Sequence, residues 1–224
     1  MKIRAGIVGG AGYTGGEMLR ILVNHPIVDI VFVHSNSNAG NLISDVHTDL
    51  FGDTDLRFTG ELSSEIDVLF LCVGHGDAKK FLAANTIDSS IKIIDLSQDF
   101  RLKVNAGNKW VYGLPELNRE AIKKASYIAN QGCFATCIQL GLLPLASKGL
   151  LNSEVHINAT TGSTGAGQSL SATSHFSWRN NNLSVYKAFE HQHLKEIGES
   201  LKQLEPGFNE AGNFVLKRGD FPRG

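Results

Sequence analysis

Apolar and polar positions follow two different periods along the first half of the chain. Short apolar runs that are typical of buried strands cover residues 2–8, 27–33, 67–73, 91–96 and 127–130. Between them, the apolar spacing predicts helices over residues 15–24, 77–85 and 118–125. Strands and helices that alternate in this way predict an α/β fold with a doubly wound, parallel sheet. Such sheets bind ligands beyond the carboxyl ends of their strands.

The pattern changes after Gly149. Residues 154–161 alternate between apolar and polar positions, which is typical of an antiparallel strand, and a second strand is visible at 213–217. Residues 190–204 predict a helix whose buried face carries Leu194, Ile197, Leu201 and Leu204.

Length and composition fit a chain of two domains. The 224 residues are 42% apolar, which is enough for a real core and excludes a wholly disordered chain. We expect a first domain over residues 1–149 and a second, α+β domain over residues 150–224. Two strands and one helix are too few to bury an independent hydrophobic core, so we expect this second domain to be incomplete.

The charge balance excludes several classes of partner. The 21 Lys and Arg residues against 22 Asp and Glu residues give a formal charge of −1, which recruits neither nucleic acid nor an anionic membrane. We see no signal peptide and no apolar stretch of transmembrane length. Cys72, Cys133 and Cys137 are therefore expected to be free thiols of a cytoplasmic protein.

A glycine-rich sequence, GGAGYTGGE at residues 9–17, follows the first predicted strand. Glycines at a spacing of three permit a tight turn and a close approach of backbone N–H groups to a pyrophosphate. The alternative is a strand-to-helix turn without a ligand, but the strand before and the helix after favour a nucleotide. The residues expected to bind it are Gly9, Gly12, Tyr13, Thr14 and Gly15.

The end of the second predicted strand bears on the choice of nucleotide. Folds specific for NAD place an acidic residue about 20 positions beyond the glycines, on the ribose 2′-hydroxyl. Residues 34–38 read HSNSN and are all neutral. With no carboxylate to repel a 2′-phosphate, NADP(H) is favoured, with Ser35 and Ser37 beside it, although the usual arginine is missing. A polar surface loop is the alternative.

Cys133 is the candidate nucleophile. It precedes an apolar run at residues 138–146, expected to be a helix interrupted near Pro144. A thiol in the first helical turn meets the positive end of the helix dipole, which favours the thiolate. A core position is the alternative for any cysteine, and we expect it for Cys72 and Cys137.

His191 and His193 open the predicted helix of residues 190–204. Residues two apart on a helix point about 200° apart, so this pair is a poor metal site, and no metal is expected. One of the two is expected to act as a general base. Two solvated histidines at a helix start are the alternative, and helix geometry does not choose between the two residues.

The chain resembles the N-acetyl-gamma-glutamyl-phosphate reductase family of the semialdehyde dehydrogenases. Six segments match it in order and spacing: GGAGYTGGE at 9–17, DLSQDFRL at 95–102, YGLPELN at 112–118, NQGCFAT at 130–136, GSTGAG at 162–167 and EHQHLKEI at 190–197. The chain departs from the family at Gln131, where proline is usual, at Cys137, where a small residue is usual, and at residues 74–76, where Pro-His-Gly is common. Family members also continue past the end of this sequence.

The resemblance implies NADPH-dependent reduction of a small acyl phosphate, N-acetyl-gamma-glutamyl phosphate, in arginine biosynthesis, by a homo-oligomer. It implies that Cys133 displaces phosphate to form a thioester and that His191 is the base, while His193 supports it or binds substrate. Arg101 is the candidate for the phosphate, with a salt bridge as the alternative. Gly165 is the candidate for a close approach to nicotinamide or substrate.

Other functions stay open from the sequence. Related dehydrogenases act on N-succinylglutamyl, aminoadipyl or aspartyl phosphate, and the segments GYTGGE and YGLPE argue against the aspartyl substrate. Two alternatives come from other classes of protein: a thiol hydrolase built on a Cys–His pair, which the glycine-rich loop disfavours, and a catalytically silent nucleotide-binding fragment.

Overall fold

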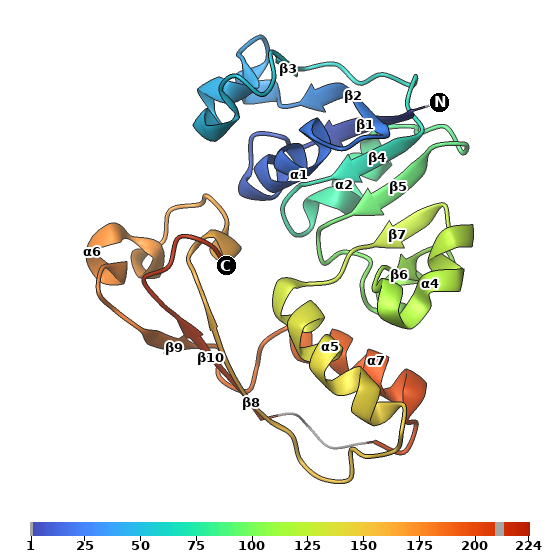
Figure 1. Ribbon diagram of the computed structural model, residues 1–224, viewed down its shortest axis with the longest axis vertical. Coiled ribbons are helices and arrows are strands. Elements are labelled where there is room, and N and C mark those ends of the chain that lie inside the picture. Colours follow the sequence, from blue (N-terminus) through green and yellow to red (C-terminus); the bar gives the residue numbers. More distant parts are fainter. Residues whose placement is uncertain (1, 209–212) are drawn as a thin grey trace. The chain divides into compact units, whose positions relative to one another are not determined.

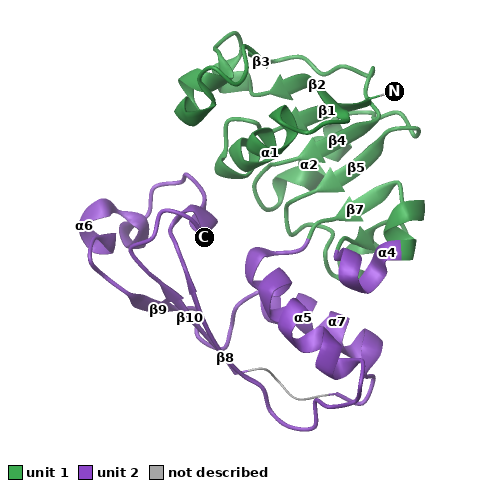
Figure 2. Cartoon of the chain, in the orientation of Figure 1, with its two compact units in different colours: residues 1–113, 120–130 green, residues 114–119, 131–224 purple. Residues whose placement is uncertain are grey.

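The computed structural model describes residues 2–208 and 213–224. The chain folds into two compact units (Figure 2). Unit 1 comprises residues 1–113 and 120–130, and unit 2 comprises residues 114–119 and 131–224. The sequence predicts a domain boundary between residues 149 and 150, after the long helix that begins at Cys133. The compact units divide before this helix, which belongs to unit 2.

Unit 1 is built on a seven-stranded sheet of order β3-β2-β1-β4-β5-β7-β6 (Figure 1). All neighbouring strands are parallel. The strands are β1 (Ile3–Val8), β2 (Val28–His34), β3 (Phe58–Thr59), β4 (Val68–Leu71), β5 (Lys92–Asp95), β6 (Val111–Tyr112) and β7 (Tyr127–Ala129). The predicted doubly wound sheet is confirmed, whereas β3 and β6, with two residues each, are too short to leave a pattern.

Helices cover both faces of this sheet. Leu19 of α1 (Tyr13–Val23) shares a buried cluster with Ile7 of β1, and Ala78 of α2 (Asp77–Ala84) shares another with Leu69 of β4. Because Ile7 pairs in register with Phe70 and successive strand residues point to opposite faces, the two clusters lie on opposite sides. Two further helices are α3 (Lys103–Ala106) and α4 (Pro115–Lys124), the second with a kink at Asn118.

The order of the strands reverses at β1. The chain runs from β1 to β2 and β3 on one side of the sheet and then crosses to β4 and β5 on the other. In open α/β sheets, ligands bind at such a point, beyond the carboxyl ends of the strands. The glycine-rich loop leaves β1 there.

Unit 2 joins helices to a three-stranded sheet of order β8-β10-β9. Helix α5 (Cys133–Ala146) packs against α7 (His193–Leu204). The strands are β8 (His156–Thr161), β9 (Ser184–Tyr186) and β10 (Asn213–Arg218), and a short helix α6 (Phe176–Arg179) precedes β9. Among helices of the described residues, none has the length and apolar character that a membrane span requires.

Three expectations for unit 2 are wrong. Strand β8 pairs in parallel with β10, because apolar alternation reports which face is buried and not the direction of a neighbour. Helix α5 runs through Pro144 without a break and ends at Ala146. Helix α7 begins at His193, not at residue 190, and Leu204 of its expected buried face is 38% exposed. Ile197 and Leu201 are buried as expected, and His193, Glu196 and Ser200 are buried with them.

Candidate active site

Close contacts within unit 1 fix the glycine-rich loop that follows β1. Gly9 has a φ of +79°, which side chains rarely adopt, and a Cβ there would lie 2.4 Å from the Cys72 carbonyl oxygen. A Cβ on Gly15 would lie 2.5 Å from the Gly9 carbonyl oxygen. These glycines let the loop pass the end of β4 and let α1 begin directly on the loop.

Gly12 differs, because the fold itself leaves room for a side chain there. Its backbone is extended, with φ −77° and ψ 169°, and a Cβ would meet only the Gly9 carbonyl oxygen, at 3.5 Å. Gly12 precedes the first turn of α1, where the N–H groups of residues 13–15 have no acceptor within the helix. The space that this glycine keeps open adjoins a helix N-terminus, where phosphate groups bind.

The segment after β2 adjoins the loop. The His34 carbonyl accepts the N–H groups of both glycines that open the loop, each at 3.2 Å. The Asn38 amide donates to the Ser35 hydroxyl at 3.3 Å and to the Ser37 hydroxyl at 3.1 Å. The structure thus brings both serines together in a segment without a carboxylate.

Arg101 is buried in unit 1, with 7% of its surface exposed. Its Nε donates to the Asn130 carbonyl at 2.8 Å, and its Nη2 donates to the Leu96 carbonyl at 2.9 Å. The guanidinium therefore joins the segment after β5 to the segment after β7. Phosphate binding by Arg101 stays a prediction.

A carboxylate network in the same segment was not expected from the sequence. Asp95 is buried, which raises its pKa, and it accepts the N–H and the hydroxyl of Ser97 at 3.0 and 2.8 Å. Asp99 accepts the N–H groups of Gly76 at 2.6 Å and Lys79 at 3.1 Å, which caps α2. The D-x-S-x-D spacing of residues 95–99 is the sequence pattern from which these carboxylate hydrogen bonds could have been predicted.

In unit 2, Cys133 is the first residue of α5, and it is exposed. The residue before it, Gly132, offers no side-chain cap to the N–H groups of the first turn. Cys72 of unit 1 is buried as expected, and burial raises its pKa to about 12. The core position expected for Cys137 is wrong: it is exposed one turn beyond Cys133, because the buried face of α5 carries Phe134, Ala135 and Ile138 instead.

His191 and His193 lie together beside the start of α5. His191 precedes α7, so the helical angle between the two residues does not apply. They are 5% and 6% exposed, which excludes the solvated alternative. Their ring centroids are 4.5 Å apart, and both rings pack on Phe134, at 5.8 and 6.2 Å. The structure therefore brings both histidines to the residue that follows the candidate nucleophile.

The Nδ1 atom of His191 accepts the His193 N–H at 3.3 Å. A neutral ring then carries its proton on Nε2. Burial lowers the pKa of His191 to about 4, and the charges of Lys187 and Arg218 act in the same direction. At neutral pH His191 is therefore uncharged, with Nε2 as a hydrogen-bond donor.

Glu196 was not singled out from the sequence, although it lies one helical turn from His193. Its carboxylate, 4% exposed, accepts the Gly132 N–H at 3.2 Å and lies 3.6 Å from the His193 Nε2. A Cβ on Gly132 would lie 2.2 Å from that Nε2, so only glycine lets the ring reach the backbone here. His193 and Glu196 thus support the start of α5.

Arg218 and Tyr186 were also missed. The Arg218 guanidinium carbon lies 4.4 Å from the Tyr186 ring centroid, and this ring lies 6.1 Å from that of His191. Within the described part of the chain, the buried Arg218 Nε has no hydrogen-bond partner. Burial raises the pKa of Tyr186, and the charge of Arg218 opposes this. The three residues of β9 are too few to give a sequence signal.

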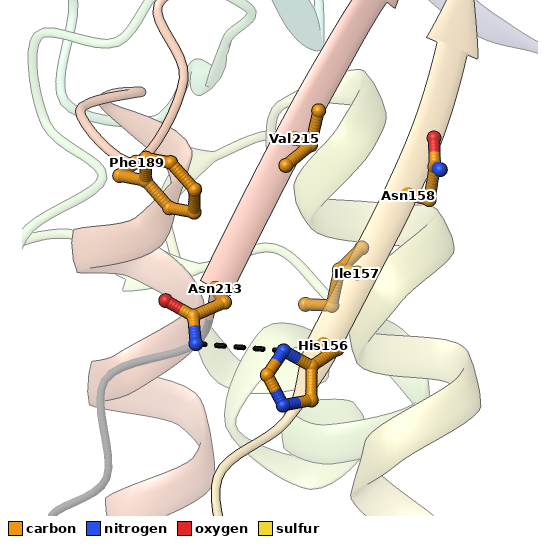
Figure 3. A pocket seen from close by; sticks show the side chains of 6 residues that line it. All are labelled: His156, Ile157, Asn158, Phe189, Asn213 and Val215. Carbon is orange, nitrogen blue, oxygen red and sulfur yellow. Dashed lines mark hydrogen bonds between the residues drawn. The ribbon is translucent and has the colours of Figure 1, made fainter.

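In the second glycine cluster, residues 162–167, Gly162 allows close backbone packing, because a Cβ there would lie 2.1 Å from the Arg223 carbonyl oxygen. Gly165 is exposed, and its role in binding stays a prediction. A pocket of about 440 Å³ lies in unit 2. It is lined by His156, Ile157, Asn158, Phe189, Asn213 and Val215 (Figure 3). None of the candidate residues lines this pocket.

Two family models match the chain. One, described as semialdehyde dehydrogenase, NAD binding domain, matches residues 4–125, and the other, described as semialdehyde dehydrogenase, dimerisation domain, matches residues 133–224. Relatives from Phocaeicola vulgatus and Azobacteroides pseudotrichonymphae, both named N-acetyl-gamma-glutamyl-phosphate reductase, are 61% and 63% identical over 223 residues. The matches cover 99% of this chain and 69% of each relative.

Solved structures share the fold. Aspartate semialdehyde dehydrogenase II from Vibrio cholerae, complexed with ASA, has a TM-score of 0.72 at 17% identity over 99% of this chain and 71% of that chain. Aspartate semialdehyde dehydrogenase from Candida albicans, with NADP, has a TM-score of 0.67 at 16% identity over 99% and 69%. At these identities the likeness shows the fold alone. The far higher identity of the curated relatives confirms the resemblance: the chain belongs to the N-acetyl-gamma-glutamyl-phosphate reductase family of the semialdehyde dehydrogenases.

Proposed function

We propose that this chain is an NADPH-dependent reductase that converts N-acetyl-gamma-glutamyl phosphate to N-acetylglutamate semialdehyde and phosphate, in arginine biosynthesis. Relatives at 61% and 63% identity carry the name of this reaction. The observation that carries the proposal is the exposed Cys133 at the start of α5, with His191 and His193 packed on Phe134, the next residue.

The glycine-rich loop of unit 1 fits NADP(H). The open space at Gly12 and the first-turn N–H groups suit a pyrophosphate. The hydroxyls of Ser35 and Ser37 can donate to a 2′-phosphate, and no carboxylate stands among residues 34–38. When bound, NADPH supplies the hydride. The other loop residues in this proposal are Gly9, Tyr13, Thr14 and Gly15.

Cys133 is the proposed nucleophile. Its Sγ attacks the carbonyl carbon of the acyl phosphate, and a C–S bond forms while the C–O bond to phosphate breaks. Phosphate leaves with the electron pair and takes up the proton that the thiol released. A thiolate is strongly nucleophilic near neutral pH, and its thioester is a good hydride acceptor. After reduction the C–S bond breaks, the aldehyde leaves, and sulfur keeps the electron pair as thiolate.

His191 is the proposed stabiliser of the substrate oxygen. Because its Nδ1 accepts the His193 N–H, its Nε2–H can donate to the oxygen that gains negative charge when the carbonyl carbon becomes tetrahedral. Conversion of thioester and hydride to aldehyde and thiolate requires no net proton. The geometry therefore favours His191 as a hydrogen-bond donor, whereas the sequence predicts a general base. A neutral ring, which burial maintains, suits this role.

The remaining roles follow from the surroundings of the thiol. His193 and Glu196 hold the start of α5 in place. Arg218 and Lys187, whose charges act on His191, suit an anionic substrate. The dimerisation-domain model over residues 133–224 supports a homo-oligomer. The cytoplasmic location expected from the free thiols stays a prediction.

The test is phosphate-dependent reduction of NADP with N-acetylglutamate semialdehyde as substrate. The N-succinylglutamate, aminoadipate and aspartate semialdehydes serve as matched comparisons. We expect the highest kcat/KM with the N-acetyl compound. A higher kcat/KM with another semialdehyde would assign a different substrate to the same reaction. If none of the semialdehydes supports phosphate-dependent reduction of NADP, the proposal is wrong.

A further inference from the structure

Gly16, the last glycine of GGAGYTGGE, has no part in the turn described above. It is buried in the first turns of α1, and a Cβ there would lie 2.6 Å from the His47 Cε1 and 2.7 Å from its Nδ1. Its missing side chain leaves the space that the His47 ring fills. His47 comes from the segment between β2 and β3, which the sequence did not connect with the loop.

His47 is bonded to the loop itself. It is 6% exposed, and its Nε2 lies 2.8 Å from the Gly10 carbonyl oxygen. Because a carbonyl can only accept, this nitrogen must carry the proton. The ring of Phe58 lies nearby, with centroids 6.4 Å apart. The bond therefore fixes the backbone of the loop between Gly9 and Gly12, two of the residues proposed to bind the nucleotide.

The segment that carries His47 is anchored on α1. Asp49 accepts two hydrogen bonds from the Arg20 guanidinium, at 2.6 and 2.7 Å, and this pairing lowers the pKa of Asp49 to about 2. Apolar side chains of the segment and of α1 share one buried cluster, which includes Ile43, Leu50, Leu19 and Leu22. The position of His47 is thus set by the body of unit 1.

We propose that His47 is a positioning residue for the dinucleotide. It holds the Gly10 carbonyl and thereby the direction of the N–H groups at the start of α1, without touching the cofactor. Gly16 is required because a larger side chain would displace the His47 ring. This inference rests on the proposed use of the loop for NADP(H).

A double-mutant cycle with Gly16→Ala and His47→Ala tests the pairing. The readout is the Kd of NADPH, titrated by nicotinamide fluorescence without substrate. Each single variant should weaken binding by roughly three- to tenfold, the loss expected for one hydrogen bond. The double variant should bind no more weakly than His47→Ala, because the added methyl then meets empty space. Purely additive losses would show that the two residues act independently and would overturn the proposal.

Two further variants separate positioning from general damage. His47→Gln keeps an N–H donor and should retain more affinity than His47→Ala. His25→Ala, just after α1, is the matched control and should leave the Kd unchanged. Thermal melting and protection of the buried Cys72 from iodoacetamide report whether each variant is folded.

The outcomes distinguish the two proposals. If the unmodified protein does not bind NADPH, the cofactor assignment is wrong. If it binds NADPH and both His47 variants bind NADPH as tightly as the unmodified protein does, the cofactor assignment is correct and the proposed role of His47 is wrong.

Discussion

The glycine-rich loop of unit 1 and the thiol site of unit 2 are built by opposite means. In the loop, side chains are left out so that other atoms can approach: the Cys72 carbonyl at Gly9, the loop's own backbone at Gly15 and the His47 ring at Gly16. In the thiol site, polar side chains are buried around one helix start: His191, His193 and Glu196 are 5%, 6% and 4% exposed.

The two regions should therefore tolerate different kinds of substitution. The loop should be damaged when atoms are added to it, because its function is the space and the N–H groups that glycines leave open. The thiol site should be damaged when functional groups are removed, because buried polar groups depend on their partners.

Cys133→Ser should remove the reductase activity almost completely, by roughly 10⁴-fold or more in kcat, because a hydroxyl is a poor nucleophile at neutral pH. Cys137→Ser is the matched control, because Cys137 lies one turn further on the same helix and is also exposed. It should keep activity near that of the unmodified protein. A larger loss of kcat in Cys137→Ser than in Cys133→Ser would identify Cys137 as the nucleophile.

His191→Asn should lower kcat by roughly 10²- to 10³-fold, the loss expected when one donor to a developing oxyanion is removed. NADPH binding, measured by fluorescence titration, should not change. His156→Asn, at an exposed histidine of the same unit, is the control. If the activity loss is confined to His193→Asn, the roles of the two buried histidines are reversed.

Gly12→Ala separates folding from binding in the loop. The fold leaves 3.5 Å between the new Cβ and its nearest neighbour, so the melting temperature should stay the same. The Kd of NADPH should rise by roughly tenfold or more, because the methyl group fills space reserved for the pyrophosphate. Gly15→Ala should instead lower the melting temperature, since its Cβ would lie 2.5 Å from a backbone oxygen. Equal effects of both variants on melting would refute the distinction.

The pH dependence of stability gives the smallest effect. Burial lowers the pKa of His191 from 6.5 in the unfolded chain to about 4 in the folded protein, so acid protonates the unfolded chain first. Stability from this group is present above pH 6.5 and is lost as the pH falls towards 4. The melting temperature should therefore fall over this range, and less steeply in His191→Asn. An equal slope in both proteins would contradict the burial of a neutral ring.

The two regions also differ in how far the sequence predicted them. The first strand, the glycine loop and the neutral end of β2 were predicted because their signals are local: apolar period, glycine spacing and the absence of an acid. The support of α5 was missed because Gly132 and Glu196 are 64 positions apart. The exposure of Cys137 was missed because a sequence does not tell which face of an apolar helix is covered.

The most direct test of the account is a single turnover in the oxidative direction. NADP and N-acetylglutamate semialdehyde are mixed with the protein in the absence of phosphate, and reduced nicotinamide is followed by absorbance. We expect a burst of one NADPH per chain and an N-acetylglutamyl adduct that peptide mass spectrometry places on Cys133. Added phosphate should release the adduct. An adduct on Cys137, or an NADPH burst without any acylated cysteine, would contradict the account.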